Sequence, residues 1–167
     1  MFIQSERNWT IHANSKPCNI SFLLYVFHNV INNLSASVVF QATGVRKSNG
    51  YSTGETVVFP TVTYNEGSGY SSSTGKFTAP VSGLYAFAKQ VCTTNTVFAA
   101  TAFVHNGQTV LASWNVGHPS YYGCGSAQVF VRMASGDRMW VKNTDDHTLL
   151  YTDTNGQISF TGTLMHI

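Results

Sequence analysis

The sequence predicts an all-β protein of about ten short strands, arranged as a sandwich, a barrel or a jelly roll. Short apolar or alternating runs are separated by turn residues every 8 to 12 positions. No stretch of 12 residues keeps the 3.6-residue period of an amphipathic helix over its full length. The polar residues are mostly neutral: only 10% of the chain is charged, against about 25% in an average soluble protein.

Length and composition narrow the class further. The chain has 167 residues, of which 43% are hydrophobic and 13% aromatic, enough to bury one domain-sized core and too many for a disordered tail. A coiled coil would need far more Glu, Lys, Leu and Ala. Net charge is +2 and no basic run exceeds Arg46-Lys47, so we expect no nucleic-acid partner.

The first half of the domain contains four expected strands. They are Ser37–Val45, Thr56–Tyr64, Lys76–Thr78 and Leu84–Cys92. Pro60 places the second of these at an edge or a bulge, because proline cannot donate to a β ladder. The Gly- and Ser-rich stretch 65–75 is expected to be a loop. In the fourth strand, Tyr85, Phe87, Lys89 and Val91 share one face.

The second half contains six more expected strands. They are Val97–Val104, Thr109–Trp114, Gln128–Met133, Arg138–Asn143, Thr148–Thr152 and Gln157–Ile167. Three turn segments pair them as hairpins, at 105–108, 134–137 and 153–156. Asn106-Gly107 is the strongest of the three signals, because both residues accept a positive φ.

Three cysteines leave the redox state open. One disulfide plus one free thiol is possible, and so are three thiols. Cys92 with Cys124 is the favoured pair, because Cys18 lies in a segment of different composition. No CxxC pair or Cys/His spacing suits zinc.

Residues 1–36 form a separate compositional block, either a signal-like segment or an N-terminal extension, or an upstream stretch from a gene model. Its apolar run, residues 20–27, is too short to span a membrane and has the length of a secretory core segment. The block holds three candidate N-glycosylation sites, at Asn8, Asn19 and Asn33. None of them would survive removal of the block as a signal.

Residues 37–167 resemble the globular-head domain of the complement one-q (C-one-q) family. The resemblance rests on an ordered series of spaced residues: Phe59, Asn65, Tyr70, Phe77, Gly83, Tyr85 and Phe87, then Gly136, Asp137 and Trp140, then Phe160 and Gly162. These residue types suit packing and turn positions, so we interpret them as fold residues. Lys89 departs from the pattern, which expects Phe or Tyr there.

The resemblance implies a ten-stranded jelly roll shared with the tumour necrosis factor superfamily, assembled as a homotrimer or heterotrimer. No Gly-x-y repeat is present, so we expect a stemless member with no collagen stem. Such members act as secreted, lectin-like pattern-recognition proteins of innate immunity, of the kind common in invertebrates, that bind carbohydrate on microbial surfaces. The alternative is a secreted ligand or scaffold, cytokine-like or synaptic-organiser-like, that binds a cell-surface or extracellular protein.

We expect no enzyme. The six histidines are scattered without an HExxH motif, and no G-x-S-x-G elbow is present to mark a nucleophile. Asp145-Asp146 and Asp153 to Asn155 offer oxygen ligands without EF-hand spacing. We therefore predict no cofactor and no tightly bound calcium or other metal.

Two stretches are candidate binding sites. The segment 114–123 carries Trp114, His118, Tyr121 and Tyr122, whose aromatic faces suit carbohydrate or peptide recognition. The alternative is that Trp114 ends a strand in the core and the tyrosines pack at a subunit interface. The basic loop around Arg46 and Lys47 could bind anionic sugars, or be a solvated turn.

Overall fold

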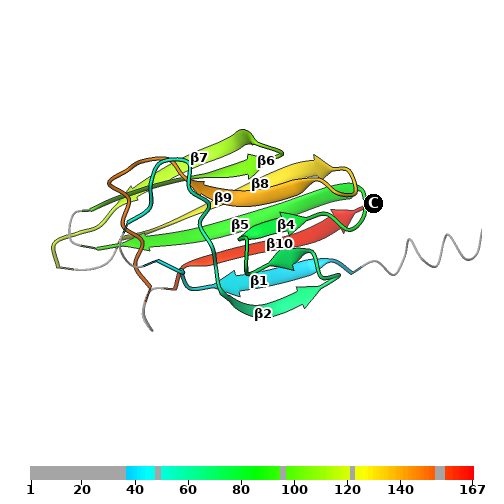
Figure 1. The fold of residues 1–167 in the computed structure, drawn as a ribbon, viewed down its shortest axis with the longest axis horizontal. Coiled ribbons are helices and arrows are strands. Elements are labelled where there is room, and N and C mark those ends of the chain that lie inside the picture. The colour runs from blue at the N-terminus through cyan, green and yellow to red at the C-terminus, as the bar shows by residue number, and fades with distance from the viewer. Residues whose placement is uncertain (1–36, 48–49, 95–96, 121–122, 153–156) are drawn as a thin grey trace, which may run out of the picture. The chain divides into compact units, whose positions relative to one another are not determined.

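The computed structural model describes residues 37–167 except 48–49, 95–96, 121–122 and 153–156. Two five-stranded antiparallel sheets face each other in it (Figure 1). Their strands are β1 (Val39–Thr43), β2 (Thr61–Glu66), β3 (Tyr70–Ser71), β4 (Lys76–Thr78), β5 (Gly83–Thr93), β6 (Phe98–His105), β7 (Gln108–Val116), β8 (Gly123–Met133), β9 (Arg138–Asn143) and β10 (Ser159–His166). Sheet A has the order β2-β1-β10-β5-β8, and sheet B has the order β3-β4-β9-β6-β7. The predicted ten-stranded all-β sandwich is confirmed.

Several strand boundaries differ from the expected ones, because tertiary pairing decides where a strand begins and ends. β2 starts directly after Pro60 and lies at the edge of sheet A, with a register shift opposite Gln41 and Ala42. The two-residue strand β3 falls in the stretch 65–75, which was wrongly expected to be loop throughout. The expected strand Thr148–Thr152 is wrong as well, because that stretch has no strand conformation.

One of the three expected hairpins is confirmed. At Asn106 and Gly107 the φ values are 48° and 90°, and β6 pairs with β7 as predicted. The hairpin expected at 134–137 is wrong: β8 pairs with β5 in sheet A, whereas β9 pairs with β4 and β6 in sheet B. The turn chemistry is present, with Gly136 at φ 90°. A tight turn therefore passes the chain from one sheet to the other. The third expected hairpin is wrong too, because residues 148–152 form no strand and β10 pairs with β1 and β5; its turn residues 153–156 lie outside the described residues.

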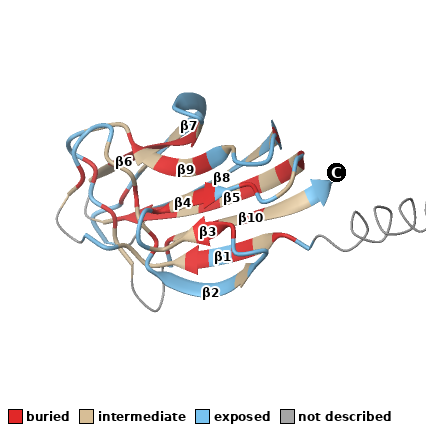
Figure 2. Cartoon of the chain, turned by 45° about the vertical axis from the view of Figure 1, so that its right-hand side comes forward, coloured by how far each residue is buried: buried red, intermediate tan, exposed pale blue. Residues whose placement is uncertain are grey.

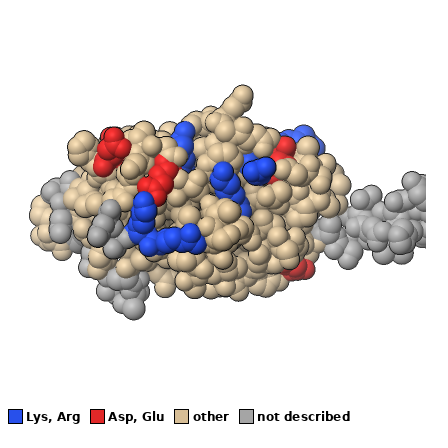
Figure 3. Space-filling model, viewed as in Figure 1, with Lys and Arg blue, Asp and Glu red and all other residues tan. Residues whose placement is uncertain are grey.

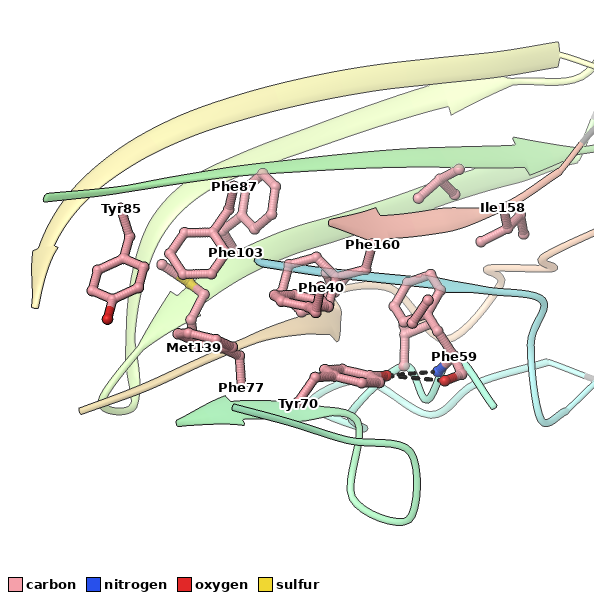
Figure 4. Packing of buried hydrophobic residues seen from close by; sticks show 14 of the residues in the cluster. Phe40, Phe59, Tyr70, Phe77, Tyr85, Phe87, Phe103, Met139, Ile158 and Phe160 are labelled. Carbon is pink, nitrogen blue, oxygen red and sulfur yellow. Dashed lines mark hydrogen bonds between the residues drawn. The ribbon is translucent and has the colours of Figure 1, made fainter. Parts of the chain in front are cut away.

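The core is a layer of aromatic rings between the two sheets (Figure 4). Phe40 lies among several of them, stacked on Tyr70 at 4.8 Å and edge-on to Phe160 at 4.9 Å between ring centroids. The Tyr70 hydroxyl donates to the carbonyl of Phe59 and accepts from its amide, at 3.1 and 3.2 Å. These two bonds satisfy the only polar group of a deeply buried ring, which fixes the 59–70 segment over the core.

Alternation along β5 confirms the predicted face assignment. Tyr85, Phe87, Lys89 and Val91 are buried, whereas the residues between them are partly exposed. Figure 2 shows the same alternation of buried and less buried residues along the central strands, with β2 and the end of β10 exposed. Cys92 and Cys124 occupy facing positions of β5 and β8 and are joined by a disulfide.

Candidate functional site

Trp114 lies in β7 and faces solvent. Its exposed fraction is 69%, so the alternative that placed it in the core is wrong. Its register partner is Ala100 of β6, and its ring stacks on Phe98 with centroids 5.7 Å apart. Because Ala99, between Phe98 and Ala100 on β6, is buried in the core cluster, Phe98 and Trp114 project from the outer face of sheet B. We call Phe98 and Trp114 the aromatic pair.

The other residues of the 114–123 candidate divide into two groups. The segment 117–122 connects β7 to β8, and His118 within it is exposed. Its Nδ1 accepts a hydrogen bond from the amide of Ser120 at 3.2 Å. Tyr121 and Tyr122 lie outside the described residues. Of the four candidate residues, the structure thus describes two, one on a strand and one in the loop.

Arg46 and Lys47 are engaged within the domain. The Arg46 guanidinium donates to the carbonyls of Ser72 and Ser73, at 2.7 and 3.0 Å. Lys47 forms an ion pair with Glu55. Glu55 therefore partly neutralises the charge of Lys47, and the Arg46 guanidinium is used in hydrogen bonds to backbone carbonyls.

The outer face of sheet A carries an apolar hollow that sequence reasoning missed. Tyr64 of β2 and Phe130 of β8, 51% and 64% exposed, stand on either side of the small residues Ala86 and Ala88 of β5. The hollow between them has a volume of about 320 Å³. Its other outward side chains are uncharged: Val39, Gln41, Gln128, Thr161 and Thr163. Large exposed apolar patches of this kind mark interaction surfaces.

A second hollow lies on the outer face of sheet B, where a polar set of residues meets. It is lined by Lys76, Asn106, Gly107, Arg138 and Trp140, and its volume is about 340 Å³. Lys76 of β4 is the register partner of Trp140 on β9, and its ammonium lies 4.4 Å from the indole centroid. The lining residues come from three separate segments between Lys76 and Trp140, so no local motif in the sequence indicates the hollow.

Among the described residues, histidine and carboxylate meet at two places, His147 with Asp145 on an exposed loop and His105 with Asp137 between two turns. His105 Nε2 and Asp137 Oδ2 are 3.0 Å apart. Asp137 also accepts from the Asn106 side chain at 2.8 Å and from the amide of Ala134 at 2.9 Å. The bond from Asn106 above all, then those from Ala134 and His105, lowers the pKa of the Asp137 carboxyl. The carboxylate therefore joins the 105–107 turn to the 134–137 turn.

The acidic loop also holds backbone in place. Asp145 Oδ1 accepts from the amide of His147 at 2.8 Å, and Asp146 Oδ1 accepts from the amide of Thr53 at 2.6 Å. Within the described residues, no group of three or more His, Cys, Asp or Glu side chains is placed to hold a metal ion. Asp153 and Asn155 lie outside those residues.

Lys89 places an amine in the core. Only 2% of it is exposed, and its ammonium donates to Thr101 Oγ1 at 2.8 Å and lies 4.9 Å from the Phe103 ring centroid. Burial lowers the pKa of this amine to about 7, because desolvation penalises the charged form. The long alkyl stem replaces the aromatic ring expected at this position, and the hydroxyl of Thr101 satisfies its end.

The fold is a jelly-roll sandwich with a hollow on the outer face of each sheet. A family model described as the C1q domain matches residues 39–165. The chain belongs to the C1q domain family, as the sequence resemblance indicated.

Curated relatives include complement C1q tumor necrosis factor-related protein 6 of the mouse, 30% identical over 135 residues, which are 78% of this chain and 49% of the relative. Human complement C1q and tumor necrosis factor-related protein 9B is 28% identical over 114 residues, 65% of this chain and 33% of the relative. The chain thus spans between a third and a half of the length of these two relatives.

Two solved structures share the fold. The globular domain of zebrafish complement 1qA superposes with a TM-score of 0.60 and 14% identity, covering 77% of this chain and 98% of that domain. Murine APRIL superposes with a TM-score of 0.59 and 14% identity, covering 77% and 99%. No helix in the described part of the chain is long and apolar enough to cross a bilayer.

Proposed function

We propose that this chain is a secreted, non-catalytic recognition protein that acts as a homotrimer and binds carbohydrate on microbial or other surfaces. Membership of the C1q domain family supports the non-enzymatic class and the trimer. The Cys92–Cys124 disulfide supports an oxidising, extracellular location, since such bonds are rare in the cytosol. A role in innate immunity belongs to the same proposal and follows from family membership.

The apolar hollow on sheet A supports assembly. Its outward side chains are uncharged, so a second copy can cover them without burying an unpaired charge. The exposed rings of Tyr64 and Phe130 supply the apolar area that a subunit interface needs. In a trimer built on sheet A, the outer face of sheet B points away from the subunit contact and stays free for a ligand.

The aromatic pair is the observation that carries ligand recognition. Trp114 is a large ring held on a strand, with one neighbour that stacks on it and most of its surface open. An aromatic face of this kind packs against the apolar side of a sugar ring while neighbouring amides and hydroxyls bind its hydroxyl groups. A trimer presents three copies, so a weak site gains avidity when the target repeats at a matching spacing.

The second candidate is a secreted ligand or scaffold that binds a cell-surface or extracellular protein. The names of the relatives, which join complement C1q to tumor necrosis factor, favour it. The exposed apolar side chains of the edge strand β7, Val110, Leu111 and Val116, also favour a protein partner.

Binding to a glycan array by wild type and Trp114→Ala tests the proposal. Wild type should bind and be competed by free sugar, and Trp114→Ala should bind roughly tenfold more weakly or worse, as expected for loss of a central aromatic contact. Val110→Ala, on the same strand, is the matched control and should bind as wild type does. Melting temperatures should agree among the three, because both side chains are exposed.

Two other outcomes would reject the carbohydrate proposal. Saturable binding to a cell-surface protein without competition by sugar would establish the second candidate. Glycan binding that Trp114→Ala leaves intact would remove the aromatic pair from the site.

A further inference from the structure

The hollow on sheet B brings together two cations that form no ion pair within the part of the chain that the structure describes. Lys76 and Arg138 both line it, and neither forms an ion pair with a carboxylate of the described residues. This distinguishes them from Lys47, which is paired with Glu55, and from Arg46, which is committed to backbone carbonyls. Their charges remain available to an external anion.

Trp140 orients one of these cations. The Lys76 ammonium lies 4.4 Å from the indole centroid, within the range of a favourable cation–π contact. The contact holds the ammonium beside the hollow before any ligand arrives, which reduces the ordering cost of binding. Figure 3 shows several Lys and Arg side chains on the face in view, with Asp or Glu side chains beside some of them.

A third cation extends the site along β9. Arg138, Trp140 and Lys142 alternate on the outer side of this strand, so the two cations flank the indole. Residues four apart in a strand are separated by about 13 Å. Lys142 reaches Thr109 of β7, with its ammonium 3.5 Å from the hydroxyl. We call Lys76, Arg138, Trp140 and Lys142 the cationic row.

We propose that the cationic row binds the sulfate or carboxylate groups of an anionic polysaccharide. The inference rests on the proposed function, because it names the class of glycan. Cations on either side of an indole suit an elongated polyanion, whose acidic groups meet the ammonium and guanidinium groups and whose sugar rings pass the aromatic ring. The row lies on the face opposite the apolar hollow of sheet A, so it stays open in a trimer built on that hollow.

An anionic membrane fits the row less well. Lipid-binding segments cluster four to eight basic residues, each worth about 1 kcal/mol at the surface. The row has three, and its ring is half-buried between strands, where it cannot insert into a bilayer. Single binding events on three cations are weak, and a trimer multiplies them on a repeating polymer.

Heparin and dextran sulfate are the probes, with neutral dextran as the uncharged comparison. The full-length double variant Lys76→Gln/Arg138→Gln should bind both sulfated polymers roughly tenfold more weakly or worse, since hydrogen bonds to charged groups are among the stronger ones. Arg46→Gln/Lys47→Gln removes the same two charges and should bind within about twofold of wild type. The charge-preserving Lys76→Arg/Arg138→Lys variant should keep most of the binding.

Each remaining outcome decides the inference. Equal weakening in the two Gln variants would overturn it, because net charge alone would then explain binding. Stronger binding to phosphatidylserine vesicles than to heparin would overturn it in favour of a membrane.

Neutral glycan bound through Trp114 with no response to heparin would overturn this inference and leave the proposed function standing. Loss of heparin binding in the Lys76/Arg138 variant, with Trp114→Ala unaffected on neutral glycans, would overturn the aromatic pair and support the row.

Discussion

Lys89 couples the stability of the domain to pH. Its pKa is about 7 in the folded chain and 10.5 as the ordinary value, so the unfolded chain binds more protons between these limits. Stability therefore rises with pH across that window and is lowest below pH 7, where the buried amine is charged. From pH 7 to pH 9 we expect a gain of about 2 kcal/mol, seen as a rise in the melting temperature of several degrees.

A Lys89→Met variant isolates this effect. Removing the amine should make the domain more stable at pH 7 and flatten the pH dependence between 7 and 9, measured by thermal unfolding at each pH. The variant should also carry Thr101→Val. Without the Lys89 amine, the Thr101 hydroxyl would lose its hydrogen-bond partner and become a buried unsatisfied group. A variant whose stability follows pH as steeply as wild type would show that another group is responsible.

At the scale of the strands, the packing of the Phe40 and Phe87 rings against β10 depends on Gly162. A Cβ there would lie 2.5 Å from a ring carbon of Phe40 and 2.6 Å from one of Phe87. Gly162→Ala should therefore destabilise the domain by about 1–3 kcal/mol through overpacking, measured by chemical denaturation. Nothing in the backbone conformation adds strain, because Gly162 is not among the glycines with positive φ.

The steric origin can be separated from other causes. Phe40→Leu makes room beside residue 162, so Gly162→Ala/Phe40→Leu should lose less than the sum of the two single variants. Gly107→Ala, with φ 90° and open space around it, should show backbone strain without a clash and no coupling to Phe40. Strict additivity in the first pair would contradict the packing explanation.

At the scale of the whole molecule, the neutral face of sheet A predicts self-association. Wild type should scatter light as three copies of one chain at micromolar concentration. Phe130→Glu should dissociate it, because the new carboxylate would be buried without a partner. Since Phe130 is 64% exposed in the single chain, the variant should still fold and keep its melting transition.

The matched control puts the same charge on the other sheet. Val110→Glu on β7 replaces an exposed apolar residue outside the apolar hollow, and should remain trimeric. A wild-type chain that stays monomeric, or equal dissociation of both variants, would contradict an assembly built on sheet A.

Most of the fold could be predicted from the chain because its signals are local. A period of two set the inward faces, as at Tyr85 and Phe87, and Asn106-Gly107 specified a hairpin through residues that accept positive φ. Spaced aromatic and glycine residues indicated the family. The predicted strand boundaries were wrong where strand pairing overrides local preference. For example, β3 forms inside a Gly- and Ser-rich stretch because Tyr70 pairs with Phe77 of β4.

The surfaces required the tertiary structure, because strands that are distant in sequence build them. Gly136-Asp137 has the same turn chemistry whether the next strand pairs with its predecessor or crosses to the opposite sheet, and only the fold showed the crossing. Trp114 could have been core or surface, since hydrophobic residues are not obliged to be buried. The basic pair visible in the sequence, Arg46-Lys47, is internally engaged. Lys76 and Arg138, which form no ion pair among the described residues, come together because β4 pairs with β9.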